Sequence, residues 1–236
     1  MIPFKPFDKI PRLNRNCTIT EKIDGTNGII HIEPAANCNV AQAVTMINGS
    51  GDTAQWAVWA GSRTRWISPG KEDNHGFAAW VAANAEELVT KLGPGTHYGE
   101  WWGGGIQRGY GVPDKRFSLF NTARWGDPAV RPACCGVVPV LYEGPFETAL
   151  IAEVMQMLAD SGSMAAPGFM NPEGIVVFHK ASNTLFKATI KGDEEGKHAE
   201  AHVKKERAPK VPRDPSKGGR RIAQVPFDGS DRRKPK

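Results

Sequence analysis

Glu21-Lys22-Ile23-Asp24-Gly25-Thr26-Asn27-Gly28 separates two β-rich stretches within residues 18–32. Asp, Asn and Gly are typical of tight turns, because they adopt the backbone angles that a turn requires. Lys22 would therefore stand at the end of a strand, directly before a turn. Such a lysine can be held rigidly with its amine directed into a cleft. The competing interpretation is an exposed lysine beside a hairpin turn.

Lys22 is the candidate nucleophile of this stretch. A lysine amine attacks only in its deprotonated form, which a site favours by placing other cations, lysines or a metal ion, close to it. The string Lys-x-Asp-Gly alone is a weak signal, because roughly one chain of this length in twenty contains it by chance. The rest of the sequence has to decide between the two interpretations.

The composition is that of an ordinary water-soluble protein. The chain has 236 residues, of which 40% are apolar and 23% charged, enough for one large domain or for one domain and a tail. No apolar run approaches the roughly 20 residues of a membrane span, and no signal peptide is recognisable at the start. Four cysteines without a CxxC pair indicate reduced thiols. We expect a cytoplasmic protein, in the host cytoplasm if a phage encodes it.

The positive charge is concentrated at the end of the chain. The formal net charge is +5, yet residues 203–236 hold twelve Lys or Arg against four acids, which gives this segment +8 and the remainder −3. Five prolines also fall there. We expect a globular domain at 1–200 and a largely disordered basic tail at 201–236. The tail either contacts a polyanion through its phosphates or only keeps the protein soluble.

Short strands separated by Gly and Asn turns dominate up to about residue 192. One amphipathic helix is expected from an N-cap at Asn74 to a stop at Gly93-Pro94, and a second at 147–159. Strands that mostly follow one another, with two inserted helices, predict an α+β fold of antiparallel sheets. Beyond residues 18–32, the expected strands are 55–62, 96–102, 115–121, 137–142, 173–179 and 184–191, the last two as a hairpin.

Five further short motifs follow the lysine stretch in a fixed order. They are Ser62-Arg63-Thr64-Arg65, Tyr98-Gly99-Glu100-Trp101, Phe117-Ser118-Leu119-Phe120-Asn121, Glu173-Gly174-Ile175-Val176-Val177 and Phe186-Lys187-Ala188-Thr189-Ile190-Lys191. Each is short, but the ordered set is specific. It resembles the covalent nucleotidyltransferases, which comprise ATP-dependent DNA and RNA ligases and mRNA capping enzymes. It is most similar to the RNA ligases of phage RNA repair and trypanosome RNA editing.

This resemblance implies both a fold and a reaction. The fold would be a ligase adenylation domain of antiparallel sheets with flanking helices and an ATP cleft between the sheets. The reaction would be the ATP-dependent sealing of RNA 5′-phosphate and 3′-hydroxyl ends. Lys22 would attack the α-phosphorus of ATP, form lysyl-AMP and release pyrophosphate. AMP would then pass to the RNA 5′-phosphate, and a 3′-OH would displace it.

The resemblance also implies a role for each matched residue. Catalysis would rest on Lys22, on Glu173, which engages the metal, and on Lys187, which contacts the α-phosphate. Mg²⁺ is the expected ion, with Mn²⁺ as the alternative, because the ligands are oxygens. The expected nucleotide contacts are Glu21 and Ile23 at the adenine, Asn27 at phosphate or metal-bound water, Arg63 at the ribose or the substrate phosphate, Glu100 at the ribose, Phe120 (with Phe117 in reserve) stacked on adenine, and Lys191.

Asn27 favours RNA ligases within the superfamily, because DNA ligases and capping enzymes usually have arginine there. The residues after Lys191 are also too few and too Pro-rich for the OB-fold domain of those enzymes. The pattern departs at Thr189, where a second lysine is expected and Lys191 or Lys197 would supply its charge, and at Asn121, where an acid is common. RNA is the expected partner, with no membrane and no obligate protein partner. The alternatives are a DNA nick ligase and an inactive nucleic-acid-binding module.

The Gly-rich residues 99–111 contain two tryptophans and Arg108. They form either a flexible lip over ATP that offers a stacking surface, or a loop whose tryptophans pack on the core. Packing is the expectation for one tryptophan, and the other is open.

Overall fold

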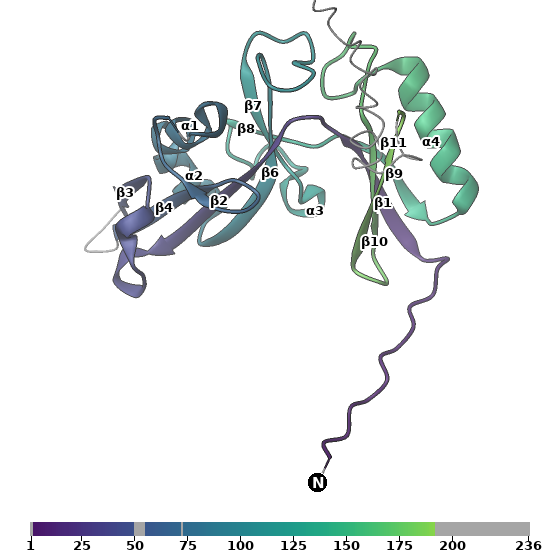
Figure 1. The fold of residues 1–236 in the computed structure, drawn as a ribbon, viewed down its shortest axis with the longest axis horizontal. Helices are drawn as coiled ribbons and strands as arrows, with labels where there is room; N and C mark the ends of the chain where they lie inside the picture. The colour runs from purple at the N-terminus through teal and green to yellow at the C-terminus, as the bar shows by residue number, and fades with distance from the viewer. Residues whose placement is uncertain (1, 50–54, 72, 192–236) are drawn as a thin grey trace, which may run out of the picture. The chain divides into compact units, whose positions relative to one another are not determined.

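The computed structural model describes residues 2–49, 55–71 and 73–191, which form two β-sheets with helices packed on one face of each (Figure 1). Residues up to 194 belong to one compact unit. The predicted domain boundary at 200 and the basic tail at 201–236 lie outside the described residues. Among the described residues, no helix has the length and apolarity to cross a membrane.

Sheet A contains the strand that ends at Lys22. Its strands, all antiparallel to their neighbours, are in spatial order β11 (Thr184–Thr189), β10 (Gly174–His179), β1 (Asn16–Lys22) and β9 (Val140–Pro145). Helix α4 (Thr148–Ser161) packs on one face, and Ile19, Leu158 and Ile175 are buried there. Because strand side chains alternate between faces, Lys22 points away from the face that buries Ile19.

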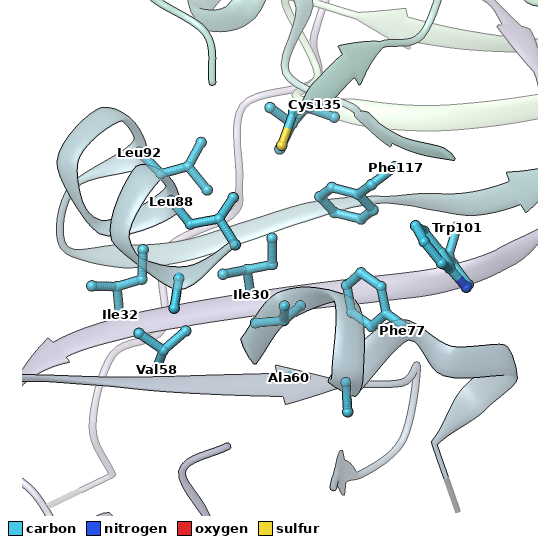
Figure 2. Packing of buried hydrophobic residues seen from close by; sticks show 14 of the residues in the cluster. Ile30, Ile32, Val58, Ala60, Phe77, Leu88, Leu92, Trp101, Phe117 and Cys135 are labelled. Atoms are coloured by element: carbon cyan, nitrogen blue, oxygen red, sulfur yellow. The ribbon is translucent and has the colours of Figure 1, made fainter. Parts of the chain in front are cut away.

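Sheet B is larger and carries the main core. Its strands are, in spatial order, β3 (Thr45–Asn48), β4 (Gln55–Gly61), β2 (Thr26–Pro34), β6 (Gly95–Gly103), β7 (Lys115–Leu119) and β8 (Cys135–Val137), with β5 (Trp66–Ile67) paired to β4. Helices α1 (Phe77–Ala83) and α2 (Ala85–Leu92) cover one face, as Figure 2 shows. Each large side chain that is fully buried there stabilises the fold by roughly 1.5–3 kcal/mol.

The α+β prediction is confirmed, but the expectation of purely antiparallel sheets is wrong at one pair. Strands β7 and β8 are parallel, because helix α3 (Thr122–Trp125) and the following loop return the chain to the N-terminal end of β7 before β8 begins. The strand expected at 137–142 is two strands in different sheets. Pro139 lies between them. Proline has no backbone N–H group to donate to a neighbouring strand, so a continuous strand is interrupted there.

The helix expected from Asn74 is also two helices. Asn84 interrupts it: its side-chain amide donates to the Trp80 carbonyl at 2.8 Å and competes with the helical ladder. Gly76 occupies the N-cap position of α1, and the capping side chain is Asp73 rather than Asn74, since the Asp73 carboxylate accepts from the backbone amides of Ala78 and Ala79. Short 3₁₀ turns occupy Ala35–Asn37, Val40–Gln42 and Asn74–Gly76.

The octapeptide that begins at Glu21 crosses from one sheet to the other. Residues 23–25 connect β1 of sheet A with β2 of sheet B, so the two β-rich stretches do not form a hairpin. Gly25 is required at this crossing, because a Cβ there would lie 2.5 Å from the carbonyl oxygen of Trp101. Ile23 is buried beside it in a small cluster with Trp102 and Tyr110. The interpretation of Lys22 as a residue beside a hairpin turn is therefore wrong.

Candidate active site

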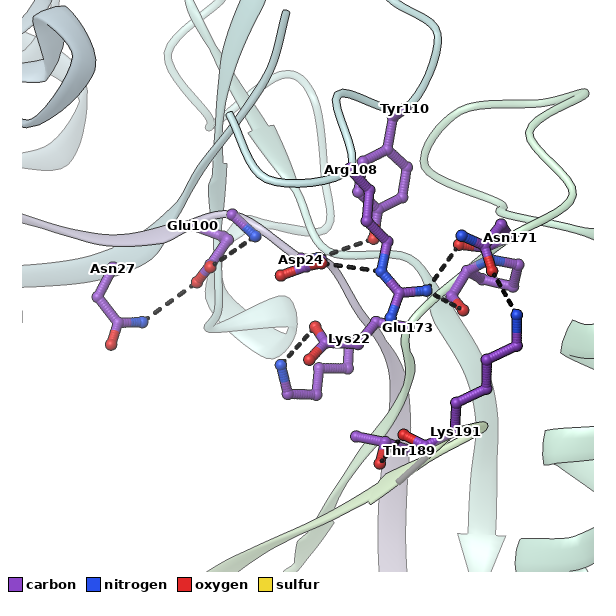
Figure 3. Close-up of polar contacts among 12 residues, drawn as sticks. Lys22, Asp24, Asn27, Glu100, Arg108, Tyr110, Asn171, Glu173, Thr189 and Lys191 are labelled. Carbon is purple, nitrogen blue, oxygen red and sulfur yellow. Dashed lines mark hydrogen bonds and ion pairs between the residues drawn. The ribbon is translucent and has the colours of Figure 1, made fainter. Parts of the chain in front are cut away.

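Lys22 and Glu173 form the centre of the site. Lys22 is the last residue of β1, and the β1–β10 register pairs it with Gly174, the residue after Glu173. The Lys22 Nζ lies 2.5 Å from Glu173 Oε2 (Figure 3), and the two side chains are only 24% and 12% exposed. A mostly buried ion pair of this kind holds the amine in one position, because removal of either partner would leave the other charge uncompensated.

Glu100 and Asn27 lie side by side in sheet B and face the same site. The β2–β6 register pairs them, and the Glu100 carboxylate accepts from the Asn27 side-chain amide and the Gly25 backbone amide, both at 3.1 Å. Burial raises the pKa of Glu100 to about 7, although the Lys22 charge opposes the rise. The carboxyl group therefore keeps its proton to a higher pH than an ordinary glutamate does.

Glu21 and Ile23 flank the lysine but point elsewhere. The Glu21 carboxylate lies on the opposite face of β1, where it accepts from the Ser163 hydroxyl at 2.6 Å and from the amides of Met164 and Ala165. Burial is the main cause that raises its pKa. Glu21 and Ile23 thus anchor the chain on either side of Lys22. Their predicted contact with adenine stays a prediction.

The last motif contributes side chains from β11 and from the residues that follow it. Lys187 is exposed and in register with Val176 and Thr20, which places it on the Lys22 face of sheet A. Thr189, in the place of the expected second lysine, is in register with Gly174, beside the Lys22–Glu173 pair. Lys191 donates to the Asn171 side-chain oxygen at 3.4 Å. Lys197, the other candidate for the second lysine, lies outside the described residues.

The two candidate stacking residues differ in exposure. Phe117 is fully buried in the core of sheet B, which removes the reserve candidate. Phe120 is 41% exposed and, with Tyr98, lines a pocket of about 130 Å³. Arg63 is exposed in the turn between β4 and β5. Among the described residues, no hydrogen bond or ion pair joins Phe120 or Arg63 to the Lys22–Glu173 pair.

The Gly-rich loop is packed rather than free. Trp101 and Trp102 are 2% and 3% exposed, so both tryptophans belong to the core, including the one that the sequence left open. Tyr110 is buried in the same loop and accepts from the Asp24 backbone amide at 2.7 Å. Burial raises the pKa of the Tyr110 hydroxyl.

Sequence reasoning missed the role of Arg108 in this site. Its guanidinium contacts Asp24 and the backbone that leads into Glu173 (Figure 3). No motif marks an arginine in a Gly-rich loop. The available signal was one cation in a loop that directly follows the Glu100 motif.

A divalent cation fits the donor chemistry of the site. Glu173 and Glu100 supply carboxylate oxygens, and Mg²⁺ is usually held by one or two carboxylates together with water and substrate phosphate. Within the described residues, no cluster of three or more His, Cys, Asp or Glu side chains forms a complete metal cage.

An α+β fold in which a carboxylate holds a strand-end lysine fits the nucleotidyltransferase class that the motifs suggest. The model of the RNA ligase family matches residues 15–191, three quarters of the chain. The chain therefore belongs to the RNA ligase family. A search of curated proteins finds no match.

Several solved structures of a Naegleria gruberi RNA ligase are similar to this chain. An apo mutant is 18% identical with a TM-score of 0.47, and a mutant with ATP and Mn is 16% identical with a TM-score of 0.49. A third, a mutant with AMP and Mn, is 18% identical with a TM-score of 0.46. The matches cover 75% of this chain and 50%, 49% and 50% of those chains, so this chain spans about half their length.

Proposed function

We propose that this protein is an ATP-dependent RNA ligase that works through a covalent lysyl-AMP at Lys22. The observation that carries the proposal is the 2.5 Å contact between Lys22 Nζ and Glu173 Oε2 in a chain of the RNA ligase family. A nucleophilic lysine needs a rigid position and a nearby acceptor for its proton, and this pair supplies both.

In the first step, Lys22 Nζ attacks the α-phosphorus of ATP. A P–N bond forms, the bond from that phosphorus to the α,β-bridging oxygen breaks, and pyrophosphate leaves with the electron pair. Glu173 Oε2 is the nearest base for the ammonium proton. Lys187, on the same face of sheet A, would neutralise an α-phosphate oxygen. Glu173 would hold Mg²⁺ or Mn²⁺, which supplies charge neutralisation of the phosphates.

The other predicted residues would hold the nucleoside part of ATP. Glu100, oriented by Asn27, would accept a hydrogen bond from a ribose hydroxyl, and Phe120 would stack on the adenine from the edge of its pocket. Arg63, exposed in its turn, would reach the ribose or the substrate phosphate. These assignments remain proposals that substitution of each side chain can test.

In the later steps, AMP passes from Lys22 to an RNA 5′-phosphate, which breaks the P–N bond and forms a phosphoanhydride. An RNA 3′-OH then attacks the activated phosphate, forms the phosphodiester and releases AMP. RNA with 5′-phosphate and 3′-OH ends is thus the proposed partner. Asn27, in place of an arginine, favours RNA over nicked DNA, and parallel sealing assays on nicked duplexes with RNA or DNA 3′-OH ends decide between them.

Self-adenylylation tests the proposal directly. Wild-type protein mixed with α-labelled ATP and Mg²⁺ should acquire label, and Lys22→Ala should lose it completely. Lys180→Ala is the matched control, because Lys180, in the turn directly after β10, also forms a 2.5 Å ion pair, with Glu143 of β9, but is more exposed. Label on Lys22→Ala, or none on wild type, would show that the proposed function is wrong; RNA binding without label would leave a binding module.

A further inference from the structure

Arg108 connects three segments that meet at the site. Its Nε donates to Asp24 Oδ2 at 2.8 Å, and its Nη1 donates to the backbone carbonyls of Asn171 and Pro172 at 2.9 and 3.0 Å (Figure 3). Asp24 follows Lys22 by two residues, and Pro172 directly precedes Glu173. One guanidinium therefore joins the segment after the lysine to the segment before the carboxylate.

The loop that carries Arg108 has little freedom to move. Gln107, Gly109 and Tyr110 have φ angles of 44°, 65° and 51°, so the chain folds tightly on both sides of the arginine. Tyr110 is 2% exposed, packs against Phe169 and accepts from the Asp24 amide. Arg108 is thus presented from a well-packed base, and its side chain is only 24% exposed.

We propose that Arg108 is a positioning residue that sets the Glu173 carboxylate against the Lys22 amine for adenylylation. The inference rests on the proposed function, because it assigns Arg108 to the same site. Three donations from one planar group fix two backbone carbonyls and one carboxylate at once. A lysine cannot reproduce this arrangement, since its ammonium is a single point of charge.

The first test is the kinetics of lysyl-AMP formation. Arg108→Ala should lower the maximal rate of Lys22 labelling by about 10- to 100-fold, as expected for a displaced reacting group, and leave the KM for ATP within about threefold. Arg108→Lys should recover part of the rate. A rate for Arg108→Ala equal to that of the wild type would overturn the proposal, as would a loss that appears only in the KM.

Arg116→Ala is the matched control for this test. Arg116, in β7 directly after the same loop, forms a similar ion pair with Asp114 at 2.7 Å. Among the described residues, none of its hydrogen bonds or ion pairs reaches Glu173. It should label at the wild-type rate. If Arg116→Ala were as slow as Arg108→Ala, a general loosening of the loop would explain both, and the specific role would be lost.

A second readout does not depend on ATP. Reductive methylation followed by peptide mapping measures the reactivity of Lys22 in each variant. Arg108→Ala and Asp24→Asn should each make Lys22 react several-fold faster, because the Glu173 carboxylate is no longer held against it, and the double variant should add little. Unchanged reactivity in Arg108→Ala would contradict the proposal even if wild type never acquired label, a result that would separately end the proposed function.

Discussion

The Lys22 amine and the Glu173 carboxylate are placed by strand register. Lys22 of β1 is the register partner of Gly174 of β10, the residue that follows Glu173, and a slip of one residue would turn the lysine to the other face. The motifs predicted that Lys22 and Glu173 belong to the site. They did not predict that the strands carrying these residues pair with each other. The order of the motifs predicts which residues belong to the site, whereas the register of the paired strands determines which of their side chains are in contact.

Glu100 gives a prediction of pH dependence at the same scale. Its pKa is raised in the folded protein to about 7 from its ordinary value of 4.5, so between these values the folded state binds more protons than the unfolded state. Its contribution to stability is therefore complete below about pH 4.5 and is lost as the pH rises through 7.

Replacing Glu100 by Gln should remove this dependence. From pH 5 to pH 8 the free energy of unfolding of the wild type should fall relative to Glu100→Gln, by an amount on the order of 1–3 kcal/mol. Urea unfolding at a series of pH values measures the difference. Parallel curves for the two proteins would show that the Glu100 carboxyl titrates near its ordinary value.

At the scale of elements, the start of α1 depends on one carboxylate. Asp73 accepts from the amides of Ala78 and Ala79, which have no helical partner at this end. Asp73→Ala should lower the free energy of unfolding by about 1–2 kcal/mol, measured by urea denaturation. Asp127→Ala, which removes a cap from an exposed turn at Ala129, should change it by less than about 0.5 kcal/mol. Equal losses would show that capping the start of α1 adds nothing beyond the loss of an exposed carboxylate.

Most strands and the α4 helix could be predicted because their apolar spacing is regular. The errors arose where one side chain overrides the local pattern. Asn84 stops a helix whose apolar spacing continues, and Pro139 separates two strands that read as one. Arg108 was not predictable, because its three acceptors come from residues 24, 171 and 172 and meet only after folding.

At the scale of the whole molecule, charge divides the chain more clearly than hydropathy. Residues 203–236 carry +8 and the remainder −3. Removal of residues 204–236 should leave Lys22 labelling within about twofold but weaken RNA binding. Each lost phosphate contact should lower the slope of log K against log salt by about 0.7 for single-stranded RNA. An unchanged affinity and slope, measured by fluorescence anisotropy, would show that this segment takes no part.

The connection from α4 to β10 holds the end of β1 from both faces. Its first residues bind Glu21 on one side, and Glu173 at its end binds Lys22 on the other. The adjacent residues Glu21 and Lys22 of β1 are thus both held by the same connecting segment. New chain ends, an inserted tag or a protease site between residues 163 and 172 should therefore weaken the contacts of Glu21 and of Lys22 together. Among the described residues, the turn at Ala181-Ser182-Asn183 has side-chain hydrogen bonds to His179 at the end of β10 but none to Glu21, Lys22 or Glu173, and it is the better position at which to open the chain for circular permutation.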